Sequence, residues 1–483
     1  MIAFANMGNH RTAWRGFFVV ALLMLGAQLT AVWGTFYLAT DDYLIMTFGR
    51  ADINIERLFA RQTGGTPAIR PVSLLLSRLE FLAFGEAVMP RIAINACINV
   101  LSGAMLALIL DGLFKRPKYA ILTGLAFIAW PLHAEGLAWF HSGHTSIPIG
   151  MLTLSVLAAY ARGWSMLTTS ILLVIALMTR ENAVVTGPLL LAMGWYRHRA
   201  LTPAMKSILP YAAILLVYVC IRLWQMSIAL QGDAQLPVGQ DPLATTFYLI
   251  FHLLGPVHPG LPGAHVLLAI TVISLILLMS RATSKIKYAG FWIVICCLPF
   301  APLYDTGDPL FEAAVSAYER RWYHLYLPAA GMAWLVASAV GEHMKAAVAA
   351  IVCLLLLQLA NAGWYADLGR DLRQTHQQLA DIIQDPAPIA LVIPEETLLG
   401  GLVEHQVLDI PRIFTARAPM VYRWLPDGDG TEYVRAAQDP FGYPAWMTLR
   451  KGFHLPAGTR HFVWNEVQKR LEPGTAPSRP THR

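Results

Sequence analysis

The chain of 483 residues is 56% hydrophobic and only 14% charged, with a mean hydropathy of +0.50. Soluble domains carry about 25% charged residues, so the composition excludes an ordinary soluble protein and makes the apolar runs candidate membrane spans. The net charge of +6 comes from Lys and Arg residues that form no basic block, so nucleic-acid binding is not expected.

A membrane-spanning helix needs about 20 apolar residues. Such runs predict about eleven spans, at residues 16–37, 89–113, 119–132, 144–161, 165–179, 182–196, 207–229, 264–280, 288–303, 322–340 and 346–364. All five cysteines lie in apolar runs without metal-ligand spacing. Neither a disulfide framework nor a metal site is therefore expected.

The basic residues predict the orientation of these spans. With the N-terminus cytoplasmic, the short loops on that side hold Lys115, Arg116, Arg162, Arg197, Arg199 and Lys345, as the positive-inside rule requires. The opposite, non-cytoplasmic face then receives residues 38–88, 133–143, 230–263, 304–321, the turn at Arg180 and Glu181, and everything after 365.

The first outer loop follows a span directly with "LATDDYLIMTFGR", which places Asp41 and Asp42 at the membrane surface. The next residues have apolar positions at helical spacing, which predicts one or two helices lying in the interface. "RPVS", residues 70–73, is typical of a helix start with Pro71 in the first turn.

We expect a membrane domain over residues 1–364 and an extracytoplasmic region over 365–483. The latter begins with a polar amphipathic helix, followed by a strand at "PIALVIP" and a hairpin at "RHFVWNEVQKRL". These elements predict a small α/β domain over roughly 388–471, with a disordered tail after it.

Polar residues collect in the outer loops. They include Asp41, Asp42, His133, Glu135, His141, His144, Arg180, Glu181, Arg320 and Arg321. Charges at membrane depth usually line a cavity or pathway. Structural roles are open for each: a helix cap for Asp41, a local ion pair for Arg180 and Glu181, and interfacial hydrogen bonds for the histidines rather than metal binding.

The order of these motifs resembles a known family. After the acidic pair come "RPVSLLLSRLEFLAFG", "PLHAEGLAWFHSGHTS", "TRENAVVTGPLLL" and "YHLYLPAAG". This order is similar to that of the GT-C class of integral-membrane glycosyltransferases, especially the protein O-mannosyltransferases and their transmembrane-and-TPR branch. Gly143-His144 replaces a Gly-Arg pair of that pattern. No TPR array follows, which favours a prokaryotic-type member in a bacterial inner membrane.

The resemblance implies an all-α polytopic GT-C fold and an inverting transfer of a sugar from a polyprenyl phosphate. The acceptor would be a hydroxyl group of a protein, lipid or glycan on the non-cytoplasmic side. Asp41 would be the catalytic base and Asp42 its partner, because a phosphate leaving group needs no general acid. His133, Glu135, Arg180, Glu181, Arg320 and Arg321 would bind the donor, with the lipid-linked sugar as co-substrate and no cofactor.

Two other classes remain open. A secondary transporter or lipid flippase would have charges near the middle of the membrane, broken helices and inverted repeats. No repeat is visible and the charges lie at span ends on one face. A non-catalytic envelope-assembly factor would use its outer domain to bind partners.

Overall fold

The structure, a computed structural model, describes residues 2–35, 70–230, 325–340 and 343–382 without a gap, and parts of 249–299 and 384–474. Within this described part the chain is mostly helical, and strands occur only beyond residue 388. The helices are α1 (Ile2–Ala31), α4 (Pro71–Phe84), α5 (Val88–Phe114), α6 (Pro117–Ile128), α7 (His133–Ala138), α8 (Phe140–Arg162), α9 (Met166–Thr179), η1 (Glu181–Val185), α10 (Thr186–His198), α11 (Leu201–Leu230), α14 (Ile286–Cys297), α15 (Tyr326–Val340) and α16 (Met344–Ile382).

Each predicted span that the structure describes overlaps a helix, whereas α4 and α7 are helices in predicted outer loops. Among the described helices, four are long and apolar enough to cross a membrane: Arg11–Ala31, Val88–Phe114, Leu201–Trp224 and Met344–Ile382. Shorter apolar helices include those in α6, α8, α9, α14 and α15. The predicted span at 264–280 is described only in part, and the interfacial helices predicted before residue 70 lie outside the described residues. The expected class, an all-α polytopic membrane protein with a small C-terminal sheet, is confirmed.

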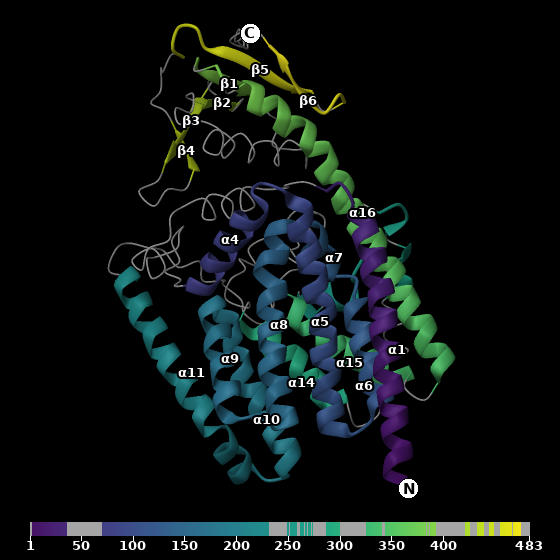
Figure 1. The fold of residues 1–483 in the computed structure, drawn as a ribbon. Coiled ribbons are helices and arrows are strands. Elements are labelled where there is room, and N and C mark those ends of the chain that lie inside the picture. Colours follow the sequence, from purple (N-terminus) through teal and green to yellow (C-terminus); the bar gives the residue numbers. More distant parts are fainter. Residues whose placement is uncertain are drawn as a thin grey trace.

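The helix bundle has two ends (Figure 1). We call the end that carries the C-terminal strands the sheet end, and the other the amino-terminal end. The chain begins at the amino-terminal end, whereas α16 leads up to the sheet (Figure 1). This arrangement fits the predicted odd number of crossings. Which end faces the cytoplasm stays a prediction from the basic loops.

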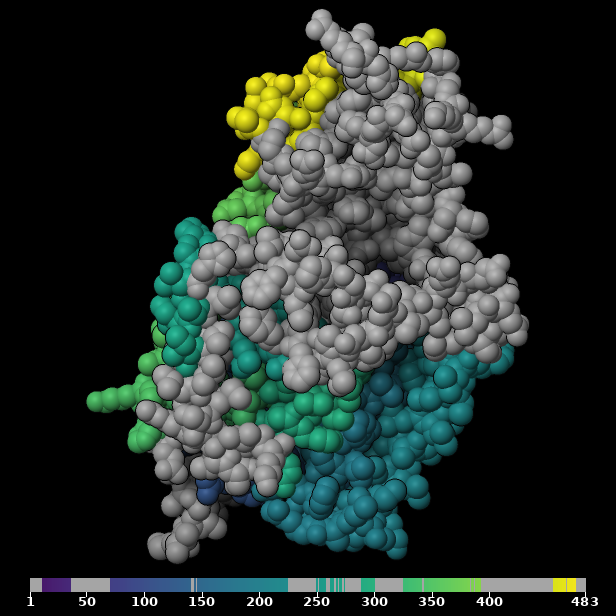
Figure 2. All heavy atoms as spheres, turned by 180° about the vertical axis from the view of Figure 1, so that it is seen from behind, coloured from purple at the N-terminus to yellow at the C-terminus, as the bar shows by residue number. Residues whose placement is uncertain are grey.

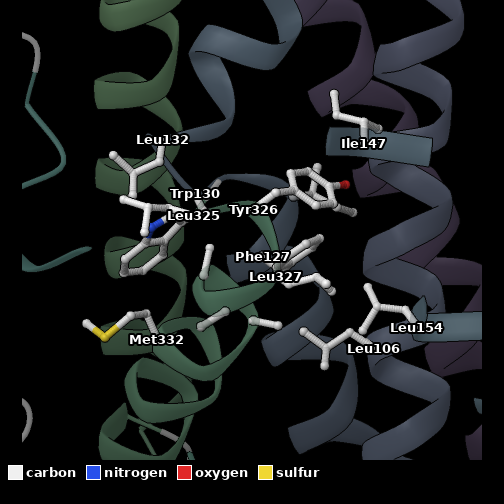
Figure 3. Close-up of a cluster of buried hydrophobic side chains, with 14 of the residues drawn as sticks. Leu106, Phe127, Trp130, Leu132, Ile147, Leu154, Leu325, Tyr326, Leu327 and Met332 are labelled. Carbon is white, nitrogen blue, oxygen red and sulfur yellow. The ribbon is translucent and has the colours of Figure 1, made fainter. Parts of the chain in front are cut away.

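Close helix packing forms the centre of the bundle, where α5 contacts both α6 and α8. Gly103 of α5 faces Gly124 of α6: a Cβ atom at Gly103 would lie 2.8 Å from the Gly124 carbonyl oxygen and 2.4 Å from Ile128 Cγ1. Small residues of this kind let helices approach closely in a membrane. Phe127 and Tyr326 fill the adjoining core between helices (Figure 3).

Buried amides hold the chain where α6 ends. Gln28 Nε2 of α1 donates to the Ile128 carbonyl oxygen at 3.1 Å, and Gln358 Nε2 of α16 donates to the same oxygen at 2.8 Å. Gln358 Nε2 also lies 3.1 Å from the Trp130 carbonyl oxygen. Both glutamines are at most 1% exposed. The bonds to Ile128 satisfy the carbonyl group at the end of α6, and the Trp130 carbonyl oxygen also accepts the His133 amide at 3.0 Å.

The C-terminal region forms a six-stranded mixed sheet in the order β4-β3-β2-β1-β5-β6. β1 pairs in parallel with β2 and β5, and the other neighbours pair antiparallel. The predicted strand and hairpin are confirmed as β1 and as β5–β6. The strands are β1 (Ile389–Val392), β2 (Val421–Leu425), β3 (Glu432–Gln438), β4 (Pro444–Thr448), β5 (Arg460–Asn465) and β6 (Arg470–Pro473).

The predicted amphipathic helix is not separate from the last span, because α16 continues unbroken through residue 364 as a 39-residue helix. Its polar second half binds the β5–β6 hairpin. Lys469 Nζ lies 2.5 Å from Asp371 Oδ2, and the Leu471 amide donates to Gln378 Oε1 at 3.0 Å. From behind, the hairpin is visible in yellow above the green end of α16 (Figure 2). The helix thus ties the sheet to the membrane bundle.

The Gly103 contact predicts a specific loss of stability. Gly103→Ala should lower the free energy of unfolding by about 1–3 kcal/mol, because the new methyl group meets a backbone carbonyl. Gly26→Ala is the matched control, since a Cβ atom at Gly26 meets nothing within 4 Å. Thermal unfolding of the purified variants in detergent measures both. Equal unfolding temperatures for the two variants would contradict the close packing of α5 against α6 at Gly103.

Candidate functional site

An arginine–glutamate pair holds the start of α4 against the turn that follows α9. Arg70 Nε donates to Glu181 Oε2 at 3.0 Å, and Arg70 Nη2 donates to Glu181 Oε1 at 2.5 Å. A planar guanidinium forms this two-point contact with a carboxylate. Pro71 occupies the first turn of α4, as predicted, because its fixed φ suits that position.

More than one arginine surrounds this carboxylate. Burial alone would raise the pKa of Glu181, but the charges of Arg70 and Arg180 and the hydrogen bonds from Arg70 lower it to about 2. Tyr218 of α11 interacts electrostatically with Glu181 and Arg70, and also with Arg222 one helical turn along α11, so Arg222 adds a further positive charge near this pair. We call Arg70, Arg180, Arg222 and Glu181 the arginine cluster. With Glu181 ionised, the cluster carries a net positive charge.

The same helix, α4, makes further polar contacts along its length. Ser73 Oγ donates to the Thr179 carbonyl oxygen at 2.8 Å. Ser77 Oγ lies 3.0 Å from His144 Nε2, and His144 Nδ1 lies 3.3 Å from Glu80 Oε2. Ser77 and His144 are buried. These contacts fix α4 against α8 and α9, and thereby fix the position of Arg70.

His133 and Glu135 lie on α7 at the sheet end, and both side chains are 1% exposed. The His133 ring lies 4.4 Å from the Tyr326 ring and 4.6 Å from the Phe127 ring, between centroids. Burial lowers the pKa of His133 to about 3, a shift that the Tyr326 backbone opposes only partly. His133 is therefore neutral at physiological pH. It can donate or accept a hydrogen bond, but it supplies no positive charge for a phosphate.

Four of the predicted site residues lie outside the described residues: Asp41, Asp42, Arg320 and Arg321. The described residues that flank this segment in the sequence, Thr35 and Arg70, both make hydrogen bonds at the sheet end. On one side, Thr35 Oγ1 donates to the carbonyl oxygen of Ala138 at the end of α7, at 3.1 Å. On the other side, Arg70 pairs with Glu181.

The described residues contain no group of three or more His, Cys, Asp or Glu side chains that could hold a metal ion. The side chain of His141 lies outside the described part. His144, which the sequence offered with it as a possible ligand, contacts Ser77 and Glu80.

The sequence analysis missed several members of this site. It treated Arg70 only as part of a helix start, and it passed over Ser77, Glu80 and Arg222. An ionisable residue inside the apolar span 207–229 was the available signal for Arg222, and the signal for Arg70 was its place before Pro71 in an outer loop. Their common partner could not be inferred, because Arg70 and Glu181 are 111 positions apart.

Comparisons with known proteins give only distant structural similarities. No protein-family model matches the chain, and no curated protein matches it. Among solved structures it is similar to ArnT from Cupriavidus metallidurans in the apo state, at 15% identity and a TM-score of 0.49, covering 85% of this chain and 86% of that one. The undecaprenyl phosphate-bound form of that ArnT gives 15% identity, a TM-score of 0.42 and coverages of 92% and 99%. The Archaeoglobus fulgidus oligosaccharyltransferase in the apo form gives 12% identity and a TM-score of 0.39, and the match covers 82% of this chain and 64% of that one. Since these TM-scores are below 0.5, we base the function on the residues themselves.

The lowered pKa of Glu181 predicts a pH dependence. An ordinary glutamate titrates near pH 4.5, whereas Glu181 stays ionised to about pH 2. Its ion pairs therefore stabilise the fold fully above pH 4.5, and this stabilisation is lost as the pH falls toward 2. Glu181→Gln should unfold at a lower temperature than the wild type at pH 7, and the gap should shrink below pH 4.5.

Thermal unfolding in detergent over this pH range provides the measurement. Asp381→Asn, at an exposed position near the end of α16, is the control and should show no such converging gap. If wild type and Glu181→Gln unfolded at the same temperature at pH 7, the stabilising role of Glu181 would be refuted. A difference in unfolding temperature that stayed constant down to pH 3 would also refute it.

Proposed function

We propose that the protein is an inverting glycosyltransferase of the GT-C type. It would move a sugar from a polyprenyl-phosphate donor to a hydroxyl acceptor on the non-cytoplasmic side of the membrane. The observation that carries this proposal is the arginine cluster, which gathers three guanidinium groups and one carboxylate at the sheet end. The order of the sequence motifs supports it independently.

The charge of the cluster suits a lipid phosphate. Glu181 balances one of the surrounding positive charges and orients Arg70 through two hydrogen bonds. The remaining positive charge favours an anion, and the planar fork of an arginine binds phosphate oxygens at two points. As the sugar leaves, negative charge gathers on the phosphate, so fixed guanidinium groups would stabilise the transition state.

The acidic pair would supply the base. Thr35, six residues before Asp41 in the sequence, donates to the Ala138 carbonyl oxygen at the end of α7, which supports a role of the acidic pair at this site. Asp41 would take the proton of the acceptor hydroxyl while Asp42 orients it. The phosphate departs without a general acid, so a second catalytic carboxylic acid of the glycosidase kind is not needed.

The donor and acceptor are narrower proposals. The motif order is similar to that of the O-mannosyltransferase branch, so a polyprenyl-phosphate mannose is the first donor to assay. Protein, lipid and glycan hydroxyls are separate acceptor assays. Arg320 and Arg321 would add to the donor site, and Glu135 and His133 would contact the sugar.

Arg180→Lys tests the phosphate role. The lysine keeps the charge but loses the fork, so the KM for the lipid-linked donor should rise about tenfold while the protein still folds. Arg162→Lys is the matched control, because Arg162 pairs with Asp111 at 2.9 Å at the amino-terminal end of the bundle. An unchanged donor KM in Arg180→Lys, or an equal rise in both variants, would make Arg180 a structural partner of Glu181.

Asp41→Asn tests the catalytic role. The asparagine keeps the shape and can still cap a helix, so stability should fall by at most about 1 kcal/mol. Loss of the base should lower the rate of sugar transfer by about 10²-fold or more, with donor binding retained. Asp42→Asn is the comparison variant, and its rate of sugar transfer should fall less than that of Asp41→Asn. Transfer by purified Asp41→Asn at the wild-type rate would refute the assignment of the base.

A further inference from the structure

An apolar cavity lies at the amino-terminal end of the bundle, opposite to the arginine cluster. It opens between α5, α10, α14 and α15 and has an empty volume of about 390 Å³, its open side included. Its walls are almost entirely apolar and include Phe114, Met193, Tyr196, Tyr288, Trp292 and Trp334. The glycosyl-transfer proposal assigns no role to it.

Aromatic rings in mutual contact form one wall of this cavity. The Phe114 ring lies 5.6 Å from the Trp334 ring and 5.1 Å from the Tyr196 ring, and Tyr196 lies 5.3 Å from Tyr288, all measured between centroids. Edge-to-face contacts of this kind make a rigid surface. Trp334 is 4% exposed, and its indole N–H has no hydrogen-bond acceptor among the described residues.

Positive charge borders the same cavity. Arg199 lies over the Tyr196 ring, with its Cζ atom 4.5 Å from the centroid. Lys115 and Arg197 directly follow the lining residues Phe114 and Tyr196, and Arg116 follows Lys115; all three are exposed, as Arg199 is. Among the described residues, none of these four side chains forms an ion pair. The bordering acid Asp111 is already paired with Arg162.

The positive-inside rule accounts for basic residues at this end of the spans, but it requires neither an apolar cavity nor a guanidinium stacked on its wall. We propose that the cavity binds an acyl chain of an anionic phospholipid of the surrounding membrane, with the lipid phosphate beside Arg199 and Lys115. Basic pockets between membrane helices bind anionic headgroups.

The test uses the purified full-length protein in detergent with two phospholipids of identical chains, anionic phosphatidylglycerol and zwitterionic phosphatidylcholine. Native mass spectrometry measures bound lipid at equal concentrations. The wild type should bind more phosphatidylglycerol than phosphatidylcholine. Because one basic residue near an anionic headgroup changes affinity about fivefold, Arg199→Gln should reduce that excess about fivefold.

Lys345→Gln is the matched control, since it removes one exposed positive charge at the start of α16, which does not line the cavity. It should leave the preference unchanged. A wild type that binds both lipids equally would overturn the proposal. So would an Arg199→Gln variant that keeps the preference, or a Lys345→Gln variant that loses it to the same degree. Sugar transfer is not part of the readout, so failure here leaves the glycosyltransferase proposal standing.

Discussion

A helix that ends at membrane depth must find donors for its freed carbonyl groups, and the sheet end of this bundle depends on that constraint. α6 stops at Ile128, and the chain then turns into α7 with His133 and Glu135. Ile128, Trp130 and Leu132 are at most 1% exposed, so water does not reach this backbone. Buried amides from α1 and α16 bond it instead: Gln28 and Gln358 bond the Ile128 carbonyl, and Asn361 of α16 lies 3.3 Å from the Pro131 carbonyl oxygen. These amides therefore set the position of α7, to which Thr35 at the end of the described N-terminal part is bonded.

The two ends of the bundle have different electrostatic designs. At the sheet end, the positive groups converge on one carboxylate, and the bidentate Arg70–Glu181 contact fixes their geometry. At the amino-terminal end, the basic residues are exposed and border an apolar cavity. The first arrangement suits a phosphate that must be held while a bond to it breaks. The second suits a lipid that remains in place.

Local signals predicted much of the fold. Apolar run length located the helices, Pro71 marked the start of α4, and the β5–β6 hairpin followed from its strand pattern. The sequence predicted a span up to residue 364 and an amphipathic helix after it, but not that the two form one continuous helix, α16. Nor did it reveal the arginine cluster, since Arg70 and Glu181 meet only once α4 packs on α9. The partners of Gln28 and Gln358, 330 positions apart, depend in the same way on the packing of whole helices.

The central claim is that this bundle consumes a lipid-linked sugar. Mass spectrometry of polyprenyl-phosphate sugars and of surface glycans, in cells with and without the protein, tests it most directly. The account predicts that cells lacking the protein accumulate one polyprenyl-phosphate sugar and lose one glycan modification, and that the wild-type gene restores both. Unchanged amounts of both the lipid-linked sugars and the glycans would contradict it.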